Sequence, residues 1–269
     1  MSEGQGEMSF WGHLDELRKV LFKIAGVVIL VSIVMFIAMP YVFDTVVLAP
    51  THHDFPLYAL FDAIMPPEPG TPPFDIDLIN INLASQLFIH LSMSGYTAAV
   101  ICFPIIIYLL WGFISPGLYE NERKNSRTAF LFGIIMFYLG IAVGYFLVFP
   151  LTLRFLATYQ LSETIHNTLT LDSYMDNFLG ICLIMGIVFE LPLVAWLLGK
   201  FGILTRAFFS KYRRHAIVAL LVAAALITPT GDPFTLMIVF IPIYSLWEFS
   251  AFIVPVPSKD DDVSEDEKE

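Results

Sequence analysis

The sequence predicts an all-α, polytopic membrane protein: a bundle of six transmembrane helices, the last two short, with both termini in the cytoplasm. Three observations carry this prediction: the composition, the apolar runs and the positions of the basic residues. Hydrophobic residues make up 57% of the 269 residues, and the mean hydropathy is +0.73. A soluble core of this size cannot bury so much apolar surface, so lipid is expected to cover it.

Six apolar runs account for the helices. The first four, at about residues 20–43, 85–111, 128–150 and 174–198, reach the roughly 20 residues that cross hydrocarbon. The last two, at about 216–227 and 234–247, are shorter. They either cross a locally thinned bilayer or form a re-entrant hairpin around the tight polar turn at 228–233. We favour two crossings, because thinning and snorkelling can absorb such a mismatch.

The basic residues give the orientation. Three lie just before or at the start of the first run, three lie between the second and third, five lie between the fourth and fifth, and two are in the tail. Only Arg154 falls on the other side. By the positive-inside rule both termini are cytoplasmic. We therefore expect one membrane domain over residues 1–254, with cytoplasmic loops at about 112–127 and 199–214.

The remaining segments are polar. An outer loop at about 44–84 carries six acidic residues and no Lys or Arg, and its Pro-rich part at 65–73 cannot be regular helix or interior strand. Residues 255–269 form an acidic tail that is expected to be disordered. The acidic N-terminus does not resemble a cleaved signal peptide. Cys102 and Cys182 lie in apolar runs, where packing is a better interpretation than a disulfide.

Glu190 lies inside the fourth apolar run and needs an explanation. A carboxylate at this depth costs about 2.5–3.5 kcal/mol on insertion scales, so its side chain is expected to face protein or water. Pro192 follows closely and should bend or open the helix. Two interpretations stay open for Glu190: a polar group in a cavity that meets a substrate or partner, which we favour, and a structural hydrogen bond to another span.

Two carboxylates on the predicted cytoplasmic face have few basic residues at helical spacing with which to form ion pairs. In a helix, Asp15 has basic residues at i+3 and i+4, whereas Glu16 must share Lys19. In the same way Glu120 has two basic residues at helical spacing, and Glu122 has none. Glu16 and Glu122 could therefore accept a guanidinium from another molecule by bidentate hydrogen bonds. The alternative is an ordinary solvated surface, which these residues alone would favour.

Other chemistry has little support in the sequence. His52, His53 and Asp54 could touch a metal, but adjacent histidines in a loop are usually polar surface. No phosphate-binding P-loop, His-Glu-x-x-His or Gly-x-Ser-x-Gly string occurs, which excludes enzymes built on these devices. We expect no enzymatic activity, no metal, no cofactor and no nucleic-acid partner.

Four separated motifs, in order, resemble the TatC family, the multispanning subunit of the twin-arginine protein translocase. His-Leu-Asp-Glu-Leu-Arg-Lys at 13–19 resembles the family's segment before the first span. Trp111 to Lys124 resembles its first cytoplasmic loop, Phe-Glu-Leu-Pro at 189–192 its fourth span, and Ile-Thr-Pro-Thr-Gly-Asp-Pro at 227–233 its last outer turn. The resemblance covers residues from about 10 to 252.

This resemblance implies a receptor for signal peptides with paired arginines. Such a receptor works with single-span TatA and TatB subunits in the lipid membrane, as a homo-oligomer within a larger complex, and exports folded proteins with the proton-motive force. It implies that Glu16 and Glu122 bind the arginines. The residues that would shape the surrounding surface are Leu17, Arg18, Phe113, Pro116, Leu118 and Arg123.

The resemblance also assigns Glu190 as the intramembrane acid. It places outer-face and partner contacts at Pro50, Thr228, Asp232 and Thr235. One departure stands out: many members of the family have a glutamine where this chain has Leu236, so that polar partner contact is missing unless Thr235 substitutes for it. Two rival classes remain, a proton-coupled small-solute transporter and a membrane scaffold. The transporter is less favoured because the two halves show no internal repeat.

Overall fold

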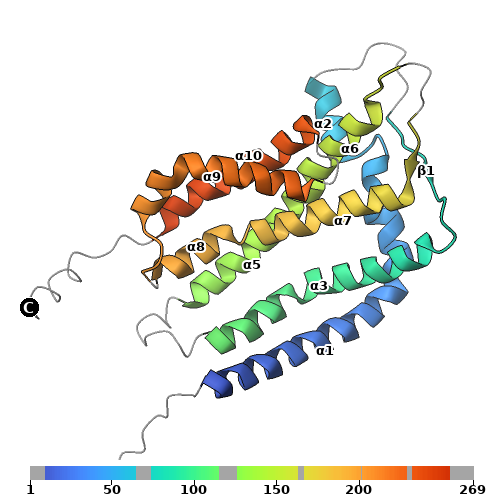
Figure 1. Ribbon diagram of the computed structural model, residues 1–269. Helices are drawn as coiled ribbons and strands as arrows, with labels where there is room; N and C mark the ends of the chain where they lie inside the picture. The colour runs from blue at the N-terminus through green and yellow to red at the C-terminus, as the bar shows by residue number, and fades with distance from the viewer. Residues whose placement is uncertain are drawn as a thin grey trace, which may run out of the picture. The chain divides into compact units, whose positions relative to one another are not determined.

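The computed structural model describes residues 10–64, 74–114, 126–162, 167–200, 202–228 and 232–254. Its long helices, which contain the six predicted apolar runs or most of each, are α1 (Phe10–Val42), α3 (Ser85–Ile114), α5 (Ser126–Val143), α7 (Leu171–Val188), α9 (Arg206–Ile227) and α10 (Pro233–Ile253) (Figure 1). The predicted polytopic helical membrane protein is confirmed.

Shorter elements extend and connect these helices. Their bounds are η1 (Phe43–Val47), η2 (Ala49–Thr51), α2 (Pro56–Ile64), β1 (Leu78–Ile79), η4 (Gly144–Val148), α6 (Phe149–Thr158), β2 (Leu169–Thr170) and α8 (Leu191–Lys200). The strands pair in parallel, with Leu78 opposite Leu169 and Ile79 opposite Thr170. The predicted outer loop therefore contains ordered helix and strand within its described part.

Five helical stretches of the described chain are long and apolar enough to cross a membrane. They are Gly12–Ala63, Ser85–Phe113, Phe130–Thr158, Leu171–Lys200 and Pro233–Ile253. Helix α9 is not among them, because its first half carries Arg206, Lys211, Arg213 and Arg214. Its apolar part is the short run predicted at 216–227. Both α9 and α10 continue beyond their apolar runs, to 22 and 21 residues.

The described chain divides into two compact units. The first lies within residues 1–48 and 82–134, and the second within 49–81 and 135–269. In the first unit α1 and α3 run antiparallel, side by side along most of their length (Figure 1).

A proline and a histidine join α1 to α3. Pro40 lies inside α1 and has no N–H, so the carbonyl of Phe36 loses the donor four residues ahead. The Nε2 atom of His90, on α3, lies 2.8 Å from that carbonyl oxygen. A carbonyl can only accept, so Nε2 carries the hydrogen. The His90 ring also stacks on the Phe36 ring, with centroids 3.9 Å apart and planes 8° apart.

In the second unit, glycines let α7 closely approach the end of α5 and the start of η4. A Cβ atom on Gly140 would lie 2.5 Å from the carbonyl oxygen of Met185, and one on Gly144 would lie 3.1 Å from the Cα of Cys182. From the other helix, a Cβ on Gly186 would lie 2.9 Å from a side-chain atom of Ile141. Small residues at such contacts let backbones meet in membrane bundles, where packing replaces the hydrophobic driving force.

Helices α9 and α10 form an antiparallel pair in the same unit (Figure 1). Arg213 of α9 donates to Glu248 Oε2 at 2.6 Å, and the Tyr244 hydroxyl donates to Glu248 Oε1 at 2.7 Å. The sequence indicates only that Glu248 ends an apolar run. The structure shows that both of its carboxylate oxygens have partners.

We expect Gly140→Ala to destabilise the protein, because the added methyl group would overlap the backbone of α7. Overpacking of this kind typically costs about 1–3 kcal/mol. Gly180→Ala is the matched control on α7, where an added Cβ meets nothing within 4 Å. Alanine favours helix over glycine, so this control should keep or raise stability. Thermal unfolding of the purified protein in detergent measures both, and equal melting temperatures would contradict the close contact.

We expect His90→Leu to cost about 1–3 kcal/mol, because it leaves the Phe36 carbonyl without a donor in an apolar setting. The same change should cost less in a Pro40→Ala background, where the N–H of residue 40 can donate to that carbonyl. Melting temperatures of the four proteins in this double-mutant cycle give the coupling. Identical costs in the two backgrounds would show that His90 does not act as the missing donor.

Candidate functional site

The predicted recognition segments before the first span and after the second meet at one end of the first unit. The ring of His13, in the first turn of α1, stacks on that of Phe113 at the end of α3, with centroids 4.2 Å apart and planes 24° apart. Glu16 lies one turn further along α1 and is exposed, as is Arg18, while Leu17 is half-buried. The antiparallel helix pair therefore brings together residues about 100 positions apart.

The local pairing of Glu16 differs from the prediction. Lys19 Nζ lies 2.7 Å from Glu16 Oε1 and 3.5 Å from Asp15 Oδ2. The expectation that Asp15 would be the better neutralised carboxylate is wrong, because the i+3 geometry brings Lys19 closer to Glu16. All three side chains are about half exposed, and such surface pairs contribute about 0–1 kcal/mol. The pair is therefore easily exchanged for another partner.

The rest of this predicted surface lies outside the described residues. It comprises Pro116, Leu118, Glu122 and Arg123, all within 115–125.

Glu190 lies at an interruption between two helices. Helix α7 ends at Val188 and α8 begins at Leu191, so the opening predicted from Pro192 is confirmed. The backbone of Glu190 is held by its neighbours: its N–H donates to the Ile187 carbonyl and its carbonyl accepts from the Val194 N–H, both at 3.0 Å.

The Glu190 side chain, in contrast, has no partner. Both carboxylate oxygens are buried and make no hydrogen bond to any described residue. The neighbouring Phe189 is 6% exposed and packs against Gly140, where a Cβ would lie 2.7 Å from the Phe189 Cβ. The structural alternative, a hydrogen bond to another span, is absent from the described chain. An unpartnered buried carboxylate has a large capacity to bind a donor.

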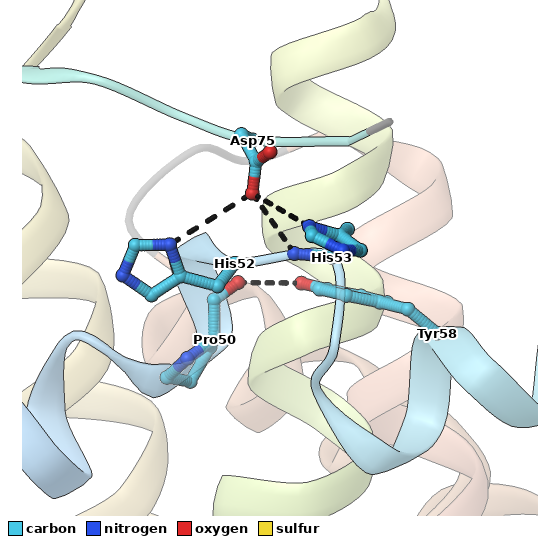
Figure 2. A network of polar contacts seen from close by, with 5 residues as sticks. All are labelled: Pro50, His52, His53, Tyr58 and Asp75. Carbon is cyan, nitrogen blue, oxygen red and sulfur yellow. Dashed lines mark hydrogen bonds and ion pairs between the residues drawn. The ribbon is translucent and has the colours of Figure 1, made fainter. Parts of the chain in front are cut away.

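Pro50 is part of a polar network at the start of the second unit (Figure 2). It is buried within η2, and its carbonyl accepts from the Tyr58 hydroxyl at 2.9 Å. The Pro150 carbonyl, distant in sequence, lies 3.3 Å from the same hydroxyl. Tyr58 is 1% exposed. A buried phenol therefore fixes the position of Pro50.

Two histidines and one aspartate lie beside this tyrosine. Asp75 lies near the rings of His52 and His53, whose Nδ1 atoms are 3.8 and 3.2 Å from its Oδ1 (Figure 2). The backbone N–H of His53 donates to Asp75, and this bond, helped by the His53 ring, lowers the pKa of the Asp75 carboxyl. The arrangement ties the chain at 52–53 to the chain at 75. In the described part of the chain, no group of three or more His, Cys, Asp or Glu side chains could hold a metal.

The turn between α9 and α10 has polar residues at both ends. Thr228 ends α9, is 2% exposed, and donates to the Ala224 carbonyl at 3.0 Å. Asp232 caps α10, accepting from the Thr235 N–H at 2.7 Å. Thr235 is 0% exposed, and its hydroxyl has no partner among the described residues. Whether these threonines contact a partner stays a prediction.

Sequence reasoning missed several residues that the fold brings together. Tyr58 and His90 each serve carbonyls remote in sequence, and Arg154 Nη2 lies 3.3 Å from Asp62 Oδ1, 92 positions away. Pro40 was the available signal for the His90 contact, since a proline in a helix leaves the carbonyl four residues before it without a donor. Cys102 and Cys182 are free thiols, in agreement with their predicted packing role.

Comparison with known proteins gives consistent matches. The family model for the Sec-independent protein translocase protein (TatC) matches residues 12–242. The TatC protein of Blattabacterium sp. subsp. Periplaneta americana is 32% identical over 259 residues, covering 94% of this chain and 97% of that protein. The TatC protein of Campylobacter jejuni is 29% identical, covering 90% and 91%.

Solved structures agree with these matches. A crystal structure of the twin-arginine translocase receptor TatC superposes with a TM-score of 0.70 at 30% identity, covering 90% of this chain and 97% of that one. A second structure of this receptor, in DDM, gives a TM-score of 0.74 at 29% identity and covers 91% of this chain and 100% of that one.

Proposed function

This chain belongs to the TatC family of Sec-independent protein translocase components, and we propose that it is the receptor for twin-arginine signal peptides in its membrane. It is a multi-pass inner-membrane protein. With single-span TatA- and TatB-type subunits it exports folded proteins, driven by the proton-motive force. Both termini lie in the cytoplasm, as the distribution of basic residues indicates.

The contact between His13 and Phe113 carries the receptor proposal. Their stack, 4.2 Å between centroids, brings the start of α1 against the end of α3. Glu16 follows His13 by one turn of α1, and Glu122 belongs to the predicted cytoplasmic segment that follows Phe113 in the sequence. Two carboxylates on adjoining segments match two adjacent guanidinium groups, each of which can form a bidentate, charge-assisted pair.

The environment of Glu16 is suited to exchange. Its present partner is Lys19, an exposed side chain of the same helix. A surface ion pair of this kind is weak, and the planar fork of an arginine matches a carboxylate better than an ammonium group does. An incoming arginine can therefore displace Lys19 at small cost.

Glu190 is proposed as a separate contact within the membrane. Its unpartnered, buried oxygens can accept a hydrogen bond or a proton during transport. Glu190 then contributes to transport rather than to folding, since nothing in the described chain uses its carboxylate. This contact is separate from the binding of the two arginines and takes place later, during transport.

The other predicted residues belong to contacts with partner subunits. Pro50, Thr228, Asp232 and Thr235 are proposed to support these contacts, with Leu236 in place of a polar residue. A single bundle is too small to pass a folded protein, so the transport path is built from several chains and the protein acts as a homo-oligomer in a larger complex.

We expect an Arg-Arg signal peptide to bind the purified protein about tenfold or more tightly than its Lys-Lys counterpart, because lysine keeps the charge but loses the bidentate geometry. Glu16→Gln combined with Glu122→Gln should remove this preference. Asp15→Asn is the matched control, a neighbouring carboxylate that should leave the preference intact. Affinities measured by fluorescence anisotropy test this, and equal binding of both peptides would favour the transporter or scaffold class.

We expect Glu190→Leu to abolish export without lowering the melting temperature, because it removes a buried acid that has no partner. Glu190→Gln should also lower export while leaving Arg-Arg peptide binding unchanged. Glu248→Leu is the contrasting variant: it should lower the melting temperature, since Arg213 and Tyr244 lose their partner. Export assays in vesicles and thermal unfolding measure these effects. Wild-type export by Glu190→Gln would show that ionisation of Glu190 is irrelevant.

A further inference from the structure

A pocket of about 1180 Å³ lies in the second unit and is not part of the proposed receptor surface. Its lining includes Asp62 of α2, together with Arg154 and Asn177, which lie near the ends of two different membrane-crossing stretches. Short segments at 74–77 and 167–169 complete the wall. The pocket therefore lies where spanning helices end, which is the depth of lipid headgroups.

Unpaired polar atoms concentrate in this pocket. Among the described residues, six buried side-chain atoms have no hydrogen-bond partner, and three of them belong to residues that line it. They are Thr152 Oγ1, Arg154 Nη1 and Asn177 Oδ1. Thr152 is only 1% exposed. Leaving such groups unpaired costs about 1–3 kcal/mol each, so their grouping calls for partners from outside the chain, either water or a ligand.

Arg154 is held with one nitrogen available. Its Nη2 donates to Asp62 at 3.3 Å. Its guanidinium carbon lies 5.5, 5.9 and 5.8 Å from the ring centroids of Tyr58, Phe61 and Phe74. These aromatic faces stabilise the cation. The arginine is thus positioned, and Nη1 remains as a donor that needs an acceptor.

The charges and positions of the other lining groups define the ligand. One arginine against three aspartates, Asp62, Asp75 and Asp77, leaves negative charge in excess, so a simple anion fits poorly. Asn177 Oδ1 needs a donor, because its Nδ2 already donates to the Ser173 carbonyl. Thr152 and Arg154 are two residues apart on α6 and so face different directions. One small ion cannot satisfy both.

We propose that this pocket binds the zwitterionic headgroup of a phospholipid, a phosphate joined to a primary amine. The phosphate accepts from Arg154 Nη1, and the ammonium group, on the other side of the pocket, donates to Asn177 Oδ1 and Thr152 Oγ1 beside the aspartates. Apolar lining residues, Phe149, Leu153 and Leu156, contact the glycerol and the first methylene groups. This lipid site is independent of signal-peptide binding.

The test uses the full-length protein, purified in detergent and stripped of lipid. Native mass spectrometry measures binding of dioleoyl phosphatidylethanolamine and dioleoyl phosphatidylglycerol. We expect the amine-bearing lipid to bind about tenfold more tightly, and Thr152→Val and Asn177→Leu each to reduce that preference several-fold. Each variant removes the polar atoms of one side chain and replaces it with an apolar side chain of similar size. Arg213→Gln is the control, an exposed arginine outside the pocket that pairs with Glu248, and should leave lipid binding and the lipid preference unchanged.

A soluble competitor distinguishes a headgroup from a whole lipid. Glycerophosphoethanolamine in large excess should displace the bound phosphatidylethanolamine. Equal binding of the two lipids, unchanged binding in both pocket variants, or failure of the soluble headgroup to compete would each overturn the proposal. Signal-peptide affinity, measured in parallel, should not respond to the pocket variants.

Discussion

The hydrogen-bonding needs of a backbone removed from water constrain the rest of this structure. A helix satisfies its own carbonyls until a proline removes a donor. His90 reaches the Phe36 carbonyl that Pro40 leaves without a donor. Elsewhere the buried hydroxyl of Tyr58 lies within hydrogen-bond distance of the carbonyls of Pro50 and Pro150. These two side chains join segments that are 54 and 92 positions apart, so they also fix which segments pack together.

Against this background of satisfied groups, the exceptions are informative. Glu190 keeps two buried oxygens without a partner, although the backbone around it is fully engaged. The Arg154 pocket keeps three more unpaired atoms. Proteins rarely leave such groups unpaired unless a ligand, substrate or proton meets them. Glu190 and the Arg154 pocket therefore share one property: each has buried polar atoms without a partner, whereas the carbonyls bonded by His90 and Tyr58 are paired.

Glycine plays the complementary role in packing. Gly140, Gly144 and Gly186 let α7 meet the end of α5 and the start of η4 without intervening side chains, and this contact supports Phe189 next to the helix break. Glu190 therefore has a rigid support although its own side chain is unpaired. A rigid frame around one unsatisfied polar group is the arrangement expected of a site that binds a substrate or a partner protein.

Much of this protein was determined by sequence alone. The apolar runs predicted the long helices, and Pro192 predicted the break beside Glu190. These features depend on neighbours in the chain. The sequence could not predict that Lys19 would approach Glu16 more closely than Asp15, that His13 would stack on Phe113, or that Asp62 and Arg154 would line one pocket. Those contacts depend on the packing of helices, and only the tertiary structure decides which side chains distant in sequence share a surface.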